Sequence, residues 1–258
     1  MTSHRCLVLR CGDPDASVMN VYGRFSDWFA RALAPWAEVV VRDVRSEPID
    51  AGWLDDTDAV VVTGSAHAVY EPHPWLPPLE ALVREAVEKR ARPFLGVCFG
   101  HQLLARSLGG TVTRNPRGRE MGTIEVCLHE AGVSDPLFRG FPRSFRAQAT
   151  HRDSVVVPPP GARVLAWSAL DDCQAFAFGA RAWGVQFHPE FSGSVLRAYV
   201  RSRRDELARE GFDPDGLHDS IDEVTRGSAV LENFAALAFG CGEPVSEPAT
   251  VGPFTPHA

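Results

Sequence analysis

The sequence has almost no lysine and no long hydrophobic run. Lys89 is the only lysine among the 26 basic residues of this 258-residue chain, so the others are all arginine. A phosphate-binding P-loop is a glycine-rich segment that ends in lysine, and the sequence contains none. No apolar stretch approaches the roughly 20 residues that a membrane-spanning helix needs. These absences argue against a P-loop nucleotide site and against a transmembrane protein.

Cysteine pairs and excess positive charge are also missing. The six cysteines show no CxxC or CxxH spacing, which argues against a metal site and against a disulfide framework. The net charge of −7 argues against a general nucleic-acid binder. The first residues lack the apolar stretch of a signal peptide. We therefore expect a cytoplasmic protein without a metal or cofactor, and without nucleic-acid or membrane partners.

The hydrophobic pattern of the first half alternates between strand and helix. Apolar strand-like runs cover residues 5–11, 38–44, 59–62 and 93–97, and helical spacing covers 17–33, 79–90 and 99–108. This order predicts an open, mostly parallel twisted sheet with helices on both faces. Short strands follow between residues 111 and 188, and helices dominate from 191 onward, ending with an apolar helix at 228–239.

A cysteine stands between a predicted strand and a predicted helix. The sequence Gly96-Val-Cys98-Phe-Gly100 has the G-x-C-x-G form of a nucleophile elbow. Small residues on both sides let the strand and the helix approach closely. The helix N-terminus favours a thiolate at Cys98 and leaves the Phe99 N–H free for an oxyanion. Taken alone, the segment fits equally well a buried, inert cysteine at the end of a core strand.

A second motif, His188-Pro-Glu190, ends another predicted strand. Proline disfavours helix at the preceding residue, and in extended chain residues i and i+2 project to the same side. Glu190 can therefore orient the imidazole of His188, which is the base that a cysteine nucleophile needs. Taken alone, the motif could be a simple turn, but the two motifs together are far more specific than either.

With these two motifs the sequence resembles a class I, triad-type glutamine amidotransferase of the GMP synthetase-like kind. GVCFGHQLLARSLGG and GVQFHPE match the two hallmark stretches of that family, and the resemblance runs over most of residues 6–191. It implies a flavodoxin-like sheet, with Cys98 as nucleophile, His188 as base and Glu190 as orienting carboxylate. We therefore expect a catalytic domain over 1–192. The helical pattern that follows predicts an extension over 193–240 packed on this domain, and the prolines after Gly240 indicate a flexible tail over 241–258.

The resemblance also suggests residues that would bind the substrate. Gly64 and Phe99 would supply the two oxyanion N–H groups, and Gln102 would line the substrate pocket. His151-Arg152-Asp153 resembles a His-Gly-Asp motif of the family, with arginine in place of glycine, and Asp153 would meet the α-ammonium group. Alternatives remain open, because Gly64 could be a plain strand-to-loop glycine and Asp153 an exposed turn residue. The resemblance also points to Glu120, but its role does not follow from the sequence.

Three other histidines are not expected to be catalytic. His101 lies next to Cys98 but points elsewhere along its helix. His67 and His73 lie in a proline-rich loop and are expected to be solvated or part of a lid. Trp75 of the same loop either covers the pocket or anchors the loop.

Three functions are compatible with these motifs. The first is hydrolysis of the side-chain amide of L-glutamine through a Cys98 thioester, with ammonia passed to a separate acceptor subunit. The second is a standalone hydrolase of γ-glutamyl peptides or amides that uses the same triad. The third is a non-catalytic regulatory subunit, which the complete triad disfavours.

Overall fold

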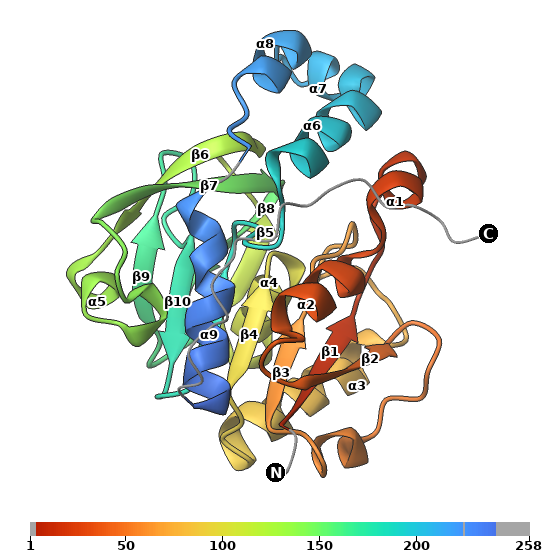
Figure 1. Ribbon diagram of the computed structural model, residues 1–258, viewed down its shortest axis with the longest axis vertical. Coiled ribbons are helices and arrows are strands. Elements are labelled where there is room, and N and C mark those ends of the chain that lie inside the picture. The colour runs from red at the N-terminus through yellow and green to blue at the C-terminus, as the bar shows by residue number, and fades with distance from the viewer. Residues whose placement is uncertain (1–3, 224, 241–258) are drawn as a thin grey trace.

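The computed structural model describes residues 4–223 and 225–240, so the predicted tail 241–258 lies outside the described residues. A nine-stranded sheet forms the centre, in the order β2-β1-β3-β4-β11-β10-β9-β6-β7 (Figure 1). A second, two-stranded sheet pairs β5 with β8. Within the described ranges, no helix has both the length and the apolar character needed to cross a bilayer.

One half of the main sheet is parallel. Its strands are β2 (Glu38–Asp43), β1 (Arg5–Arg10), β3 (Ala59–Val62), β4 (Phe94–Val97) and β11 (Ala182–Val185). Every residue of β3, β4 and β11 is buried, as expected for strands covered on both faces. Because parallel strands end at one edge, the segments after β3, β4 and β11 lie together.

The other half of the sheet is antiparallel. It contains β10 (Ala175–Phe178), β9 (Arg163–Trp167), β6 (Glu120–Leu128) and β7 (Ser144–His151). The small sheet pairs β5 (Thr111–Arg114) with β8 (Asp153–Val157). The sequence predicts short strands in place of β10, β9, β6 and β7, but it predicts neither β5 nor β8. The main sheet is therefore mixed.

Helices cover both faces of the sheet, which confirms the predicted fold class. One face packs on α3 (Leu76–Arg84) and α4 (Phe99–Ser107), and the other on α2 (Phe25–Leu33) and α9 (Ala229–Phe239). The remaining helices are α1 (Ala16–Tyr22), α5 (Glu130–Val133), α6 (Gly193–Ser202), α7 (Arg204–Arg209) and α8 (Pro214–Asp219). Short 3-10 turns cover Ala51–Leu54, Pro136–Phe138 and Arg226–Ser228.

The predicted extension 193–240 forms α6 to α9. Helix α9 joins the core of the sheet through Phe234, which is fully buried. Helices α6 to α8 lie at one end of the molecule, beyond β6 and β7 (Figure 1). Tyr199 of α6 shares a separate apolar cluster with Phe25 and Trp28 of α2.

Two helices differ from their predicted bounds. The single helix predicted over 17–33 is divided into α1 and α2, because Gly23 between them has φ 85°. The helix predicted over 79–90 begins at Leu76 and ends in a π-helical turn over Glu85–Lys89. Periodicity does not reveal either change, since the apolar spacing continues through both.

Candidate active site

Cys98 lies in a strained turn between β4 and α4. Its φ is 52°, and Ala91 is the only other non-glycine residue with positive φ in the described part of the chain. Such a conformation costs about 1–3 kcal/mol and persists only where the surrounding structure imposes it. A Cβ on Gly96 would collide with the carbonyl oxygen of Gly100, and one on Gly100 with that of Val62. The turn therefore requires both glycines.

His188 follows β11 and is held by Glu190. Nδ1 of His188 lies 2.7 Å from Oε1 of Glu190, and both side chains are buried. The ring of Phe191 stacks on the imidazole at 4.0 Å. Burial alone would lower the pKa of His188, but the charges of Glu190 and Cys98 outweigh it and raise that pKa. Among the described residues, Nε2 of His188 has no hydrogen-bond partner apart from the Cys98 thiol, which leaves this nitrogen available for proton transfer with Cys98.

Gly64 and Phe99 border the space between these side chains. A Cβ on Gly64 would lie 3.2 Å from Cε1 of His188 and 3.8 Å from Cβ of Cys98. Phe99 is the first residue of α4, whose N-terminal N–H groups have no intrahelical acceptor. Both predicted oxyanion donors therefore lie beside Cys98.

A cavity of about 480 Å³ opens from Cys98 and His188. The loop between β3 and α3 (residues 63–75, called here the rim loop) forms one wall with Ser65, Ala66 and His67. The α6–α7 segment forms another part of the wall with residues Tyr199, Ser202, Arg203 and Glu206. The helical extension predicted from residue 193 onward thus contributes directly to the cavity.

The three predicted substrate residues line this cavity as well. The side-chain amide of Gln102 donates to the carbonyl oxygen of Asp153 and to Oε1 of Gln186, both at 3.0 Å. The Asp153 carboxylate is half-buried and accepts a 2.9 Å hydrogen bond from the hydroxyl of Tyr70. It is therefore available to a ligand in the cavity.

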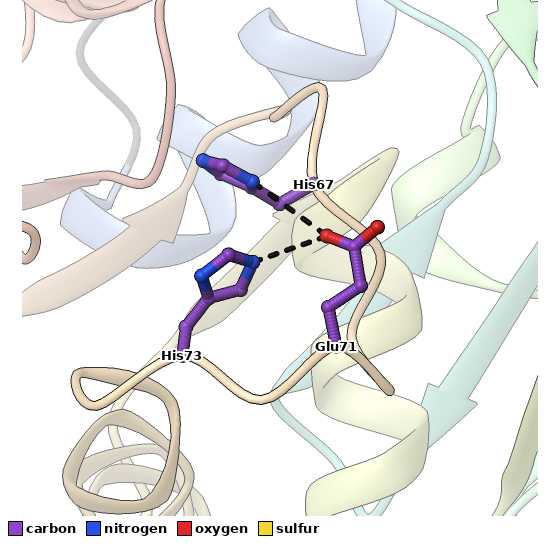
Figure 2. A group of neighbouring side chains, drawn as sticks. All are labelled: His67, Glu71 and His73. Atoms are coloured by element: carbon purple, nitrogen blue, oxygen red, sulfur yellow. Dashed lines mark hydrogen bonds and ion pairs between the residues drawn. The ribbon is translucent and has the colours of Figure 1, made fainter.

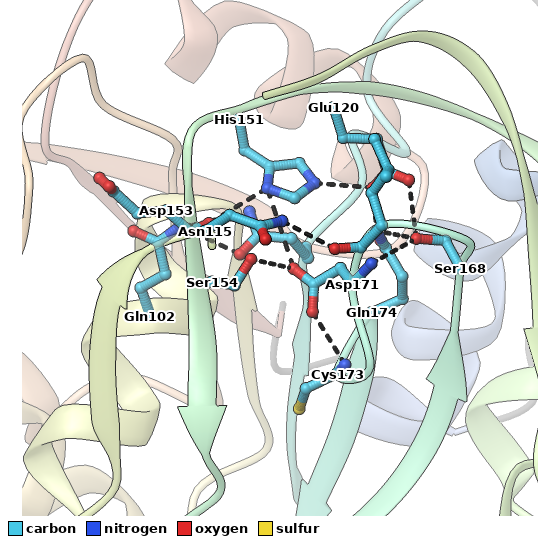
Figure 3. Close-up of polar contacts among 12 residues, drawn as sticks. Gln102, Asn115, Glu120, His151, Asp153, Ser154, Ser168, Asp171, Cys173 and Gln174 are labelled. Atoms are coloured by element: carbon cyan, nitrogen blue, oxygen red, sulfur yellow. Dashed lines mark hydrogen bonds and ion pairs between the residues drawn. The ribbon is translucent and has the colours of Figure 1, made fainter. Parts of the chain in front are cut away.

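His151 differs from the other two, because both of its ring nitrogens contact the protein. Nε2 lies 2.9 Å from Oε2 of Glu120, and Nδ1 lies 3.1 Å from the carbonyl oxygen of Asp153 (Figure 3). The Asp171 carboxylate is 3.9 Å from Nδ1. Burial alone would lower the pKa of His151, but Glu120 and Asp171 outweigh it and raise that pKa. His151 thus holds the Asp153 backbone in place.

Sequence reasoning missed most of the buried network around His151. Glu120 also accepts hydrogen bonds from the Ser168 hydroxyl and the Gln174 amide. Asp171 accepts from the Ser154 hydroxyl at 2.6 Å. These residues form no short sequence motif, since they come from different strands and turns. Only Glu120 is indicated by the sequence, through the resemblance to the family.

His101, close to Cys98 in sequence, lies in the core. It is fully buried against Phe176, with the ring centroids 5.0 Å apart, and burial lowers its pKa to about 3. A Cβ on Gly184 of β11 would lie 2.6 Å from its Nδ1. The imidazole of His101 occupies the space that the missing side chain of Gly184 leaves against the sheet.

Comparison with known proteins places these features in a family. The model of the family "Glutamine amidotransferase class-I" matches residues 17–203. A GMP synthase from Pyrobaculum aerophilum is 34% identical over 67% of this chain, and this chain spans only 32% of that protein. Gamma-glutamyl peptidase 4 of Arabidopsis thaliana is 25% identical over 91% of this chain and 87% of its own length.

Solved structures agree with this assignment. A glutamine amidotransferase from Thermotoga maritima has a TM-score of 0.69 and 25% identity, covering 92% of this chain and 97% of that one. A glutamine amidotransferase from Methylobacillus flagellatus has the same TM-score and identity, covering 92% of this chain and 93% of that one. The overall fold described above is therefore one that this chain shares with solved glutamine amidotransferases.

Proposed function

The chain belongs to the class I glutamine amidotransferase family, and on this premise we propose that it hydrolyses γ-glutamyl amide bonds through a thioester on Cys98. One observation carries the proposal. Cys98 occupies a strained elbow beside an imidazole whose Nδ1 is held by Glu190 at 2.7 Å and whose Nε2 has no other hydrogen-bond partner among the described residues.

The reaction begins with attack of the Cys98 sulfur on the carbon of the side-chain amide. His188 takes the thiol proton and gives it to the leaving nitrogen as the C–N bond breaks. The N–H groups of Gly64 and Phe99 stabilise the oxyanion, and one such donor contributes about 2.7–4 kcal/mol. Water then attacks the thioester with His188 as base, which releases glutamate and restores the thiol.

Glutamine is the smallest substrate that fits this chemistry. Its leaving group is ammonia, which would pass to a separate acceptor subunit. The 34% identity with a GMP synthase, whose name describes it as glutamine-hydrolyzing, supports this reading. Asp153 would meet the α-ammonium group, and Gln102 would hold the Asp153 carbonyl in place.

A γ-glutamyl peptide or amide is the second candidate, and the cavity favours it. At about 480 Å³ the cavity falls within the range of small-molecule sites and extends past Cys98 to the α6–α7 segment. Charged groups lie along that extension, among them Arg152, Arg203 and Glu206. A leaving group larger than ammonia would find room and polar partners there.

Hydrolysis by the purified full chain tests the proposal. Release of glutamate would be measured with L-glutamine, with a panel of γ-glutamyl dipeptides and with glutathione. Ammonia from glutamine supports the first candidate, and faster cleavage of γ-glutamyl peptides supports the second. The Cys98→Ala variant should be inactive on all of them and should fold normally.

A covalent probe covers the case in which turnover requires a partner. An electrophilic glutamine analogue should label Cys98, as located by peptide mass spectrometry. The proposal would be wrong if Cys98→Ala kept wild-type activity, or if the chain showed neither turnover nor labelling.

A further inference from the structure

The rim loop carries a second cluster of chemically reactive side chains. His67, Glu71 and His73 point toward one another from this short loop (Figure 2). Nδ1 of His67 lies 3.7 Å from Oε2 of Glu71, and Nε2 of His73 lies 3.1 Å from the same oxygen. One potential ligand atom from each residue lies within 4.8 Å of the other two.

These separations match a transition-metal site. Zinc binds imidazole nitrogen and carboxylate oxygen at about 2.0–2.2 Å, so neighbouring ligand atoms of a tetrahedral site are about 3.3 Å apart. The two measured separations lie on either side of that value. We infer that His67, Glu71 and His73 bind a divalent transition-metal ion of the zinc type at the rim of the cavity.

The chemical type of the three ligand atoms determines which class of metal ion the site prefers. Calcium and magnesium take oxygen ligands, whereas two imidazoles and one carboxylate suit zinc and its neighbours in the first transition series. Three protein ligands leave one coordination position for water or another small ligand. Glu71 is exposed, and the two histidines are partly exposed, so an ion can enter from solvent.

Part of the site is organised before an ion binds. The Glu71 carboxylate accepts a hydrogen bond from the backbone N–H of Ala68 at 3.1 Å. The ring of His73 stacks on Trp75 at 5.0 Å with an angle of 11° between the planes. Glu71 and His73 therefore have restricted orientations, which lowers the entropic cost of binding.

The proposed metal site is connected to the turn at Cys98 through aromatic contacts. Trp75 also contacts Phe99, the residue that follows Cys98, with ring centroids 5.9 Å apart. His67 itself lines the cavity. A metal ion would therefore link the two ends of the rim loop and fix it beside the cavity entrance. The inference concerns this loop alone and does not depend on the substrate proposed above.

The sequence alone indicates no metal site and assigns His67 and His73 to solvent or to a lid. Their spacing, with Glu71 between them, matches no short metal-binding motif of a helix. The cluster exists because the rim loop folds back on itself and brings residues 67, 71 and 73 together (Figure 2).

Calorimetric titration of the full chain with ZnCl₂ tests the inference. The Cys98→Ser protein serves as the background, because a thiolate beside His188 would itself bind zinc. We expect one ion per chain, and weakening by more than about tenfold in both Glu71→Gln and His73→Gln. Co²⁺ should give visible absorption bands that these two variants lose.

His218→Gln is the matched control. His218 is a surface histidine that lies 3.0 Å from the Asp219 carboxylate and belongs to no group of three potential metal ligands among the described residues. Its loss should leave zinc binding unchanged. Circular dichroism verifies that each variant folds, since Glu71 and His73 lie on a surface loop.

Tryptophan fluorescence reports the loop directly. Zinc should change the emission of the Cys98→Ser protein, and Trp75→Phe should abolish that change although the other tryptophans remain. The inference is overturned if zinc does not bind stoichiometrically, or if the folded Glu71→Gln and His73→Gln variants bind it as tightly as the parent protein.

Discussion

Two buried histidines line the cavity, and each is paired with a glutamate. His188 lies 2.7 Å from Glu190, and His151 lies 2.9 Å from Glu120. In both cases burial lowers the pKa of the imidazole, but the glutamate and the other neighbouring groups together raise it above its usual value. The pairs differ at the second ring nitrogen: that of His188 has no hydrogen-bond partner among the described residues apart from the Cys98 thiol, whereas that of His151 contacts the carbonyl oxygen of Asp153.

Because of this difference, His188 can transfer a proton, whereas His151 has a structural role. A general base needs a nitrogen within reach of the reacting group, and only His188 has one beside Cys98. His151 uses both nitrogens to connect Glu120 of β6 to Asp153, the first residue of β8. A histidine–glutamate pair therefore indicates a catalytic base only when the second ring nitrogen faces the reacting group.

Replacing each histidine by glutamine gives the largest contrast. We expect His188→Gln to lower kcat on any hydrolysed γ-glutamyl substrate by about 10⁶-fold, as for a base in a nucleophile–base pair. His151→Gln should instead raise KM, because it loosens the Asp153 backbone, and should keep most of kcat. Steady-state kinetics measures both, and equal losses of kcat would remove the distinction between the pairs.

Glu190→Gln tests the orienting role of the first pair. The amide can still hydrogen-bond Nδ1 of His188, but it cannot stabilise the imidazolium or fix the ring tautomer. We expect kcat to fall by about 10⁴-fold, which is less than for loss of His188 itself. A variant with wild-type kcat would show that His188 does not need the carboxylate.

The sequence predicts the first pair because its contacts are local. His188 and Glu190 are two residues apart, and the glycines that impose the turn at Cys98 lie within five residues. The parallel strands were predicted for the same reason, since each is a short apolar run whose pattern is complete in itself.

The second pair and the rim-loop cluster depend on tertiary folding. Glu120 and His151 are 31 residues apart and meet only because β6 and β7 are paired in that register. His67 and His73 are close in sequence, but no periodicity determines the path of a loop. The sequence also does not show that the α6–α7 segment lines the cavity, because this depends on where the helices pack.

Glu120→Gln should destabilise the fold more than it slows the reaction. The amide oxygen can still accept from His151 and Gln174, which both contact Oε2 of Glu120 now, but the neutral side chain no longer balances the positive charge of the His151 imidazolium. Breaking a buried charged pair costs about 3 kcal/mol. Chemical denaturation measures the loss, and an unchanged unfolding free energy would show that the network does not stabilise the protein.

The contribution of His151 to the stability of the fold should depend on pH. The pKa of His151 is raised in the folded protein, so its pairing with Glu120 stabilises the fold fully below the unfolded value of about 6.5. That contribution is lost as pH rises through the folded pKa. The stability difference between wild type and His151→Gln should therefore be greatest in mildly acidic buffer and shrink at alkaline pH. Denaturant titrations across pH measure it, and a pH-independent difference would contradict the charged pair.

The smallest effect is expected at Tyr70, which holds Asp153 from the solvent side. Its hydroxyl donates to Oδ1 of Asp153 at 2.9 Å, and Tyr70 is exposed, so Tyr70→Phe should cost no more than about 1 kcal/mol. We expect KM to rise by less than about fivefold, with kcat unchanged. Combining Tyr70→Phe with His151→Gln sharpens the comparison: if both residues position Asp153, the double variant should raise KM by more or less than the product of the two single effects. A strictly multiplicative result would mean that His151 acts on the substrate by a route other than Asp153.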